Sequence, residues 1–114
     1  MAEDCIFCKI VNGDFGNEFI YENEYAVAFN DINPKAPVHI LVVPKVHVAS
    51  LNELEDKILM GELLAAVKAA AKKAGLKSYK TLINTGKDAG QEVFHLHFHI
   101  LGEVNKLNGE KYNI

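Results

Sequence analysis

The sequence predicts an α+β domain: a largely antiparallel sheet of about five strands, backed by one long helix and one short N-terminal helix. Three observations predict this class. Residues 38–43 are mostly β-branched and apolar, which is typical of a central strand. Residues 55–74 repeat apolar side chains at helical spacing. Histidines alternate with apolar residues over 95–100, which is the period of a strand.

The remaining elements follow from local signals. We expect a short helix over residues 5–11, which Asn12-Gly13 ends, and a hairpin whose strands at 18–21 and 25–30 flank a turn at 22–24. A loop with two prolines covers 31–37, and Pro44 ends the central strand. Gly75 ends the long helix, and further strands are expected at 79–84 and 94–102, on either side of a turn-rich loop at 85–91.

The length of 114 residues fits one domain that can bury a modest core. We therefore expect a single domain over residues 1–114, with the motifs in a core at 5–102 and a polar tail at 103–114. The sequence shows no internal repeat and no linker.

Composition indicates an ordinary globular protein, because hydrophobic residues make up 49% and the net charge is −3. That charge gives no electrostatic reason for binding to nucleic acid or to an anionic membrane. No apolar run is long enough to span a bilayer. The acidic start Met1-Ala2-Glu3-Asp4 lacks the features of a signal peptide, so we expect a cytoplasmic protein. In that reducing compartment, the pair Cys5 and Cys8 favours metal or redox use over a structural disulfide.

Three of the five histidines lie at alternate positions, His95, His97 and His99. Because side chains on a strand repeat with period two, the three imidazoles are predicted to project from one face. Leu96, Phe98 and Ile100 would then fill a core on the other face. Imidazole serves as a metal ligand, a nucleophile and a proton carrier near neutral pH. A solvated strand that happens to be rich in histidine is the simpler alternative.

A glycine-containing loop with Gly86, Gly90 and Gln91 precedes the histidines. Glycines let backbone N–H groups approach an anion closely, so such a loop can bind phosphate, although many similar loops are only turns. Beside the histidines, the loop could hold a phosphate for attack by an imidazole. Crowding of imidazoles favours the neutral form that attack requires.

The segment His95-Leu96-His97-Phe98-His99-Ile100-Leu101 resembles the histidine-triad signature, His-φ-His-φ-His-φ-φ. The resemblance to the Hint branch of that family extends over roughly residues 5–102. It includes the segments Cys5–Ile10, Phe29–Pro34, His39–His47 and Asn84–Gln91. It implies a HIT-like fold and a hydrolase that cleaves nucleoside phosphoramidates or acyl-nucleotides to a nucleoside monophosphate.

The resemblance implies catalytic roles for four histidines. His97 matches the nucleophile that attacks the α-phosphorus and forms a nucleotidyl-histidine intermediate, which water then cleaves. His99 matches the residue that contacts the α-phosphate and helps to protonate the leaving group. His39 matches a strand histidine of the hydrogen-bond network, although a lone histidine in an apolar strand is often only a core residue. The backbone carbonyl of His95 orients the ring of the nucleophile.

The resemblance also implies a nucleotide pocket for a purine nucleotide, with adenine and guanine both left open. Asp31 matches the carboxylate that accepts hydrogen bonds from the ribose hydroxyls, although an aspartate near Pro34 also suits a turn. The base is sandwiched by residues that would equally serve a core: Phe7, Ile10, Phe15, Phe29 and Ile32. The phosphates contact Asn84, Gly90, Gln91 and Val93, together with His97 and His99. Glu92 departs from relatives that carry a hydroxyl there, and its carboxylate would disfavour an anionic leaving group.

A zinc site is implied by the same resemblance, with Cys5, Cys8, His47 and His95 as ligands. C-x-x-C is a usual half-site for zinc, which would be structural here and would fix the N-terminal helix to the sheet. A redox pair and thiols that bind no metal remain alternatives. Catalytic zinc on the triad is disfavoured, because three ligands on one strand would spread over about 13 Å.

The resemblance implies a homodimer that pairs through the long helix and a neighbouring strand. The alanine-rich face Ala65, Ala66, Ala69 and Ala70 would permit close approach of two helices. Two other functions remain open: a nucleotide-binding or interaction module without relevant catalysis, and a dinucleoside-polyphosphate hydrolase or phosphorylase of the same superfamily. The leaving group and the path of the tail are not predicted.

Overall fold

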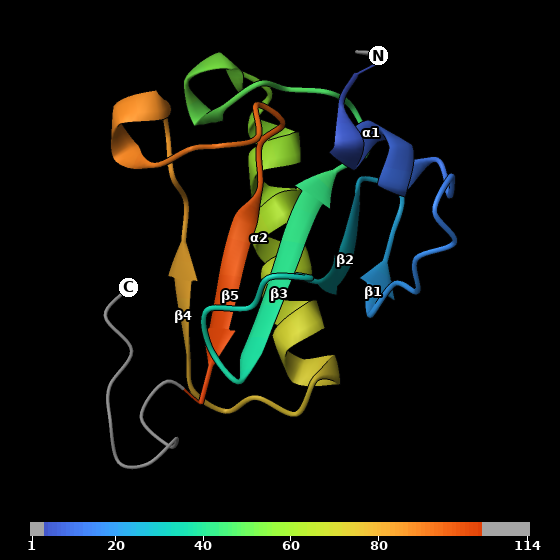
Figure 1. Cartoon of the computed structure of the whole chain (residues 1–114), viewed down its shortest axis with the longest axis vertical. Helices are drawn as coiled ribbons and strands as arrows, with labels where there is room; N and C mark the ends of the chain where they lie inside the picture. Colours follow the sequence, from blue (N-terminus) through green and yellow to red (C-terminus); the bar gives the residue numbers. More distant parts are fainter. Residues whose placement is uncertain (1–3, 104–114) are drawn as a thin grey trace.

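The computed structural model describes residues 4–103 as an antiparallel sheet of five strands in the order β1-β2-β3-β5-β4. Figure 1 shows the long helix α2 running behind this sheet, and the short helix α1 near the end of β3. The bounds are α1 Ile6–Val11, β1 Tyr21–Glu22, β2 Ala26–Asn30, β3 Val38–Pro44, α2 Lys57–Lys73, β4 Tyr79–Leu82 and β5 Phe98–Gly102, with one-turn 3-10 helices at Leu51–Glu53 and Lys87–Ala89. The predicted α+β class is therefore confirmed.

Strand β3 lies at the centre of the sheet because nearly every side chain on it is apolar and buried. Its even-numbered residues Ile40 and Val42 pack in the larger core, together with the inner face of α2. Its odd-numbered residues Leu41 and Val43 pack with α1 on the other face. A strand that is covered on both faces has this continuous apolar pattern.

Helix α2 begins at the N-cap Asp56, whose carboxylate accepts hydrogen bonds from the backbone N–H groups of Ile58 and Leu59. Its buried side chains lie at helical spacing and face the sheet: Leu59, Leu63, Ala66, Val67, Ala70 and Ala71. Two residues of the predicted alanine face, Ala66 and Ala70, are therefore 0% exposed within the protein's own core. That part of the dimer prediction is wrong. The exposed small residues of α2 are Gly61 and Ala65.

The alternation predicted for the histidine segment is present. Leu96, Phe98 and Ile100 are buried in the core against α2, as expected. The strand begins at Phe98 rather than at residue 94, however. Continued pairing with β3 would place Leu96 opposite Pro44, which has no N–H group to donate. The N–H of Leu96 instead donates to the carbonyl of Val48 at 2.7 Å.

The first hairpin is also displaced from its predicted position. β1 covers only Tyr21–Glu22, because the side chain of Asn23 accepts hydrogen bonds from the N–H groups of Tyr25 and Ala26 and fixes the turn there. None of the helices in residues 4–103 has the length and apolarity needed to cross a membrane.

Candidate functional site

The ring of His97 is held by one hydrogen bond from Nδ1 to the backbone carbonyl of His95, at 2.8 Å. Because a carbonyl only accepts, Nδ1 carries the proton and Nε2 of the neutral ring keeps its lone pair. The ring is 8% exposed. Burial lowers the pKa of His97, opposed by this hydrogen bond and by Asp31, so the neutral ring is favoured at neutral pH. A neutral imidazole with an unshared Nε2 lone pair is a competent nucleophile.

His99 follows on β5, with its ring centroid 4.9 Å from that of His97. Its Nδ1 lies 2.8 Å from Nε2 of His39 on β3. Nδ1 of His39 accepts from the backbone N–H of Lys35 at 2.9 Å, so Nε2 of the neutral His39 ring carries the proton and donates to His99. The proton of neutral His99 is then on Nε2. This chain of contacts fixes one tautomer for each ring.

The pKa of His99 is lowered to about 4 by burial, followed by the charges that His97 and His39 would carry. Burial also lowers the pKa of His39, against the opposing effect of Asp31. Asp31 Oδ2 lies 3.4 Å from His39 Nε2. At neutral pH the site therefore holds neutral rings: His97 offers a lone pair, and His99 offers an N–H donor.

These histidines line a cavity of about 630 Å³, a usual size for a small-molecule site. It lies between α1, the 30–35 loop, β3, β5 and the 84–93 loop. Most of the residues predicted for nucleotide binding line it: Phe7, Ile10, Phe29, Asp31, Ile32, Asn84, Gly90, Glu92, Val93, His97 and His99. His39 also lines it.

Two residues predicted for the nucleotide pocket do not line this cavity. Phe15 lies in the loop after α1 and is 59% exposed. Gln91 is buried, and its side chain forms hydrogen bonds to the backbone inside and beside the loop. It accepts from the N–H of Gly86 and donates to the carbonyls of Ala49 and Val93. Gln91 therefore holds the backbone of the 84–93 loop in place instead of lining the cavity.

The cavity also includes residues that sequence reasoning missed. Ile6, Leu41, Leu82 and Leu101 extend its apolar wall, and Asn17, Asn30, Asn33 and Lys35 add polar groups. The side-chain oxygen of Asn17 is buried and has no hydrogen-bond partner within residues 4–103. Alternation could have identified Leu41 and Leu101, which share a face with His39 and His99. No sequence signal brings Asn17 to the cavity, because its place depends on the path of a loop.

The 84–91 loop owes its shape to glycine at two positions with left-handed φ. Gly86 and Gly90 both have φ of 92°. At Gly90 an added Cβ would lie 2.8 Å from the side-chain nitrogen of Asn84, which donates to the carbonyl of Ala89. Glycine at position 90 therefore allows Asn84 to close the loop beside the histidines.

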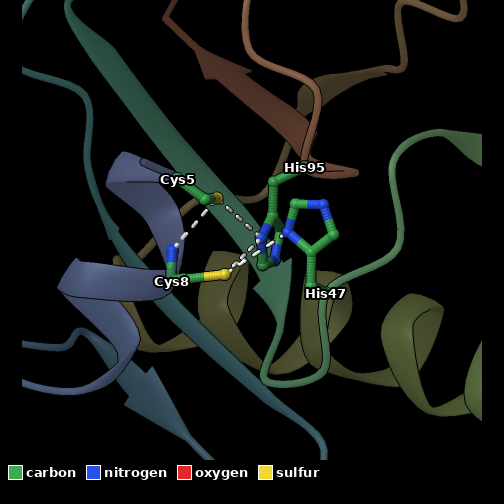
Figure 2. Close-up of side chains that lie close together, drawn as sticks. All are labelled: Cys5, Cys8, His47 and His95. Carbon is green, nitrogen blue, oxygen red and sulfur yellow. Dashed lines mark hydrogen bonds between the residues drawn. The ribbon is translucent and has the colours of Figure 1, made fainter. Parts of the chain in front are cut away.

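The four predicted zinc ligands meet at the amino end of α1. Figure 2 shows Cys5 and Cys8 of α1 pointing toward the rings of His47 and His95. The ligand atoms all lie within 4.8 Å of one another. Nδ1 of His95 is 3.3 Å from the Cys5 sulfur and 3.5 Å from the Cys8 sulfur, and Nδ1 of His47 is 3.3 Å from the Cys8 sulfur.

This donor set fits a tetrahedral metal ion. With zinc–sulfur bonds of about 2.3 Å and zinc–nitrogen bonds of about 2.0 Å, neighbouring ligand atoms lie about 3.5 Å apart, close to the observed contacts. Nε2 of His95 lies 2.9 Å from the carbonyl of Pro44, so it carries the proton and leaves Nδ1 available for a metal. Burial lowers the pKa of the His95 ring, which keeps it in the neutral form that a ligand needs.

A second group with metal-ligand chemistry, Asp31, His39 and His99, lies in the cavity. The hydrogen bond from Lys35 places the His39 proton on Nε2, which is the atom that faces Asp31 and His99. An N–H group has no lone pair for a metal. In this tautomer the group forms a hydrogen-bond chain.

Comparison with known proteins agrees with this geometry. The model of the HIT domain family matches residues 13–106. The chain belongs to the histidine triad (HIT) family. Protein HitA of Neisseria gonorrhoeae is 50% identical to this HIT protein over 103 residues, which cover 88% of this chain and 96% of the relative.

Solved structures of HIT proteins share the fold. A HIT family hydrolase from Clostridium thermocellum superposes with a TM-score of 0.87 at 39% identity, covering 94% of this chain and 96% of that one. A histidine triad nucleotide-binding protein from Candida albicans gives 0.78 at 34% identity, covering 85% of this chain and 73% of that one. The matched HIT domain begins after Cys5 and Cys8, so two of the four residues of the Cys/His cluster lie outside it.

Proposed function

We propose that this HIT protein is a Hint-like hydrolase that releases a nucleoside monophosphate from nucleoside phosphoramidates or acyl-nucleotides. The observation that carries the proposal is the hydrogen bond between His97 Nδ1 and the His95 carbonyl, which leaves a lone pair on Nε2 beside a nucleotide-sized cavity. The hydrolase and nucleotide-binding names of two structural relatives support the same class of reaction.

The reaction would proceed in two displacements. His97 Nε2 attacks the α-phosphorus in line, a nitrogen–phosphorus bond forms, and the bond to the leaving group breaks as the leaving group takes a proton from water. Positive charge then develops on the ring, where the Nδ1–H donates to the His95 carbonyl. Water next attacks the phosphorus, the nitrogen–phosphorus bond breaks and its electron pair returns to Nε2. The proton lost by the attacking water neutralises the hydroxide left by the first step, and the nucleoside monophosphate is released.

His99 would stabilise this transfer as a neutral hydrogen-bond donor. Its Nε2–H can donate to a phosphoryl oxygen without prior protonation, because His39 occupies Nδ1. The pKa of about 4 makes His99 an improbable source of a full proton at neutral pH. We therefore assign it to the α-phosphate rather than to the leaving group.

The nucleotide would lie along the cavity with its base among the apolar side chains of Phe7, Ile10 and Phe29. Asp31 would accept from the ribose hydroxyls, and the loop of Asn84 and Gly90 would contact the phosphate. A purine fits the size and apolar character of this pocket. Adenine and guanine derivatives are both substrates under this proposal.

Glu92 favours an amine as the leaving group. Its exposed side chain lines the cavity near Gly90. The described lining residues include two carboxylates, Asp31 and Glu92, and one lysine, Lys35. A further phosphate chain would bring several negative charges to this wall. The excess of carboxylates over lysines on this wall disfavours the alternative of a dinucleoside-polyphosphate hydrolase.

Turnover of adenosine 5′-phosphoramidate by the wild type and by His97→Ala tests the proposal. We expect AMP release by the wild type and a loss of at least about 10³-fold in the variant. A fully active His97→Ala would refute the nucleophile. Turnover of dinucleoside polyphosphates alone would favour the second enzyme class, and nucleotide binding without turnover of either substrate would indicate a binding module.

We further propose that the Cys/His cluster binds one structural zinc ion per chain. Cys5, Cys8, His47 and His95 would hold it, and the ion would fix the amino end of α1 to the segment that precedes β5. Elemental analysis of the purified protein should give close to one zinc per chain. Its absence after expression with added zinc would refute this claim.

We also propose a homodimer that uses the outer face of α2 and the edge strand β4. Ile58 and Leu64 are 69% and 53% exposed on α2, on either side of the small residue Gly61. Within residues 4–103, strand β4 lies at the edge of the sheet and pairs with β5 alone, and it exposes Lys80 and Thr81. Light scattering at micromolar concentration should give the mass of two chains, and a monomer would refute the proposal.

A further inference from the structure

His95 belongs to two sites at once. Its ring lies in the Cys/His cluster, with Nδ1 at 3.3 Å from the sulfur of Cys5, while its backbone carbonyl accepts from His97 at 2.8 Å. The residue is 0% exposed, and its Nε2 is held by the carbonyl of Pro44. A displacement of the His95 backbone at the cluster would therefore shift the carbonyl that orients the proposed nucleophile.

No β-ladder holds the backbone around His95. Residues 94–97 lie before β5 and make no ladder with β3. The N–H of Leu96 donates to Val48, the side chain of Leu96 is buried in the core, and the ring of His95 donates to Pro44. Contacts of the His95 ring at the cluster are therefore among the contacts that position this segment.

Helix α1 provides a second connection between the Cys/His cluster and the cavity. Cys5 is its N-cap and accepts from the N–H of Cys8, so both sulfur atoms are part of the first turn. Phe7 lies between them in sequence. Its ring packs edge-on against His97 at 5.1 Å and His95 at 6.0 Å between centroids, and it lines the cavity. The helix that carries the thiols is therefore also a wall of the proposed nucleotide pocket.

We propose that Cys5, Cys8 and His47 are positioning residues for the nucleotide site, so that metal binding at the cluster and nucleotide binding in the cavity strengthen each other. The effect acts through the His95 carbonyl on the ring of His97 and through Phe7 on the pocket wall. This inference rests on the proposed function, since it takes the cavity to be a nucleotide site. Thermodynamic linkage requires both ligands to gain the same factor in affinity, which we expect to be on the order of 10-fold.

The test measures both affinities on the full chain. Calorimetry gives the Kd of AMP for the metal-free and the zinc-loaded protein, and competition with a chromophoric chelator gives the Kd of Zn²⁺ with and without saturating AMP. We expect both constants to tighten by the same factor of about 10. If AMP binds but each affinity is independent of the other ligand, this inference is overturned while the proposed nucleotide site remains. If AMP binds neither form, the proposed function fails with it.

Two variants distinguish a role of the cluster in positioning the nucleotide site from a role in fold stability alone. His47→Gln removes the ligand that neither lines the cavity nor contacts His97, and it should weaken zinc binding and hold AMP affinity at the metal-free value. Val46→Ala, at a neighbouring position that is 56% exposed, is the matched control and should change neither affinity. AMP affinity in His47→Gln equal to that of the zinc-loaded wild type would overturn the inference.

A spectroscopic readout reports the nucleophile directly. Nitrogen-15 shifts of the His97 imidazole measure the fraction of the ring that carries its proton on Nδ1. We expect the imidazole nitrogen shifts of His97 to change when Zn²⁺ is added to the metal-free protein. Identical His97 shifts in the two folded forms would overturn the connection through the His95 carbonyl.

Discussion

Nε2 of His39 lies 2.8 Å from Nδ1 of His99, and the backbone N–H of Lys35 occupies the other nitrogen of His39. The contact joins neighbouring strands β3 and β5 on the face that carries the cavity. A main-chain group in a loop thereby determines which nitrogen of His99 carries its proton. The position of this proton therefore follows from the fold, and the carboxylate of Asp31, 3.4 Å from His39 Nε2, favours the same tautomer of His39.

Replacement of His39 tests the role of its hydrogen bond to His99. His39→Leu removes the donor to His99, which can then adopt either tautomer, and we expect kcat to fall on the order of 10²-fold. His39→Gln retains an N–H donor and should recover part of the loss. Steady-state kinetics on adenosine 5′-phosphoramidate make the comparison. Equal activities for the two variants would contradict a role in hydrogen bonding.

Lowered pH should destabilise the protein through His99. Its folded pKa of about 4 lies below the ordinary value of 6.5, so between these values the unfolded chain binds more protons than the folded one. The contribution is fully present above pH 6.5 and is lost as the pH falls toward 4. Urea unfolding from pH 7 to pH 4 should give a shallower loss of free energy for His99→Gln than for the wild type. Parallel curves would contradict the lowered pKa.

Gly90→Ala should damage the phosphate loop beyond the cost of its backbone conformation. Both Gly90 and Gly75 have left-handed φ, but an added Cβ lies 2.8 Å from Asn84 at Gly90 and meets nothing within 4 Å at Gly75. The left-handed backbone conformation alone should cost each alanine variant about 1 kcal/mol in unfolding free energy, and the contact with Asn84 adds to that cost in Gly90→Ala. Only Gly90→Ala should also weaken AMP binding, as calorimetry would measure. Equal AMP affinity in the two variants would contradict the proposed loop contact.

The N-cap of α2 should contribute measurably to stability. Asp56→Ala removes the carboxylate that accepts from the N–H groups of Ile58 and Leu59, and should lower the free energy of unfolding by about 1 kcal/mol. Glu55→Ala, one position earlier and exposed, is the control and should have little effect. Urea denaturation measures the free energy of unfolding of both variants. Equal losses of this free energy would refute the assignment of Asp56 as the N-cap.

Much of the fold follows from sequence periodicity. The alternation at 96–100 and the apolar run at 38–43 predicted two buried strands, and the structure pairs them as β5 and β3. What periodicity did not reveal was the start of β5 at Phe98, because that depends on which residue would lie opposite Pro44. Strand ends are decided by partners that are distant in sequence.

The candidate site divides in a similar way. The resemblance of motifs indicated His97, His99, His39 and Asp31, all of which line the cavity. Residues of the loops were harder to predict from the sequence, because the directions of their side chains depend on tertiary contacts. Phe15 matched a pocket position but is largely exposed, whereas Asn17, two residues later, lines the cavity without any motif.

Intact-mass spectrometry of a rapidly quenched reaction tests most directly whether His97 carries the nucleotidyl group during turnover. The wild type, mixed with excess adenosine 5′-phosphoramidate, should gain the mass of one adenylyl group, and fragmentation should locate that group on His97. His97→Ala should gain no such mass. An adenylyl group on another residue, or rapid turnover by the wild type with no adduct detected at any quench time, would contradict the account.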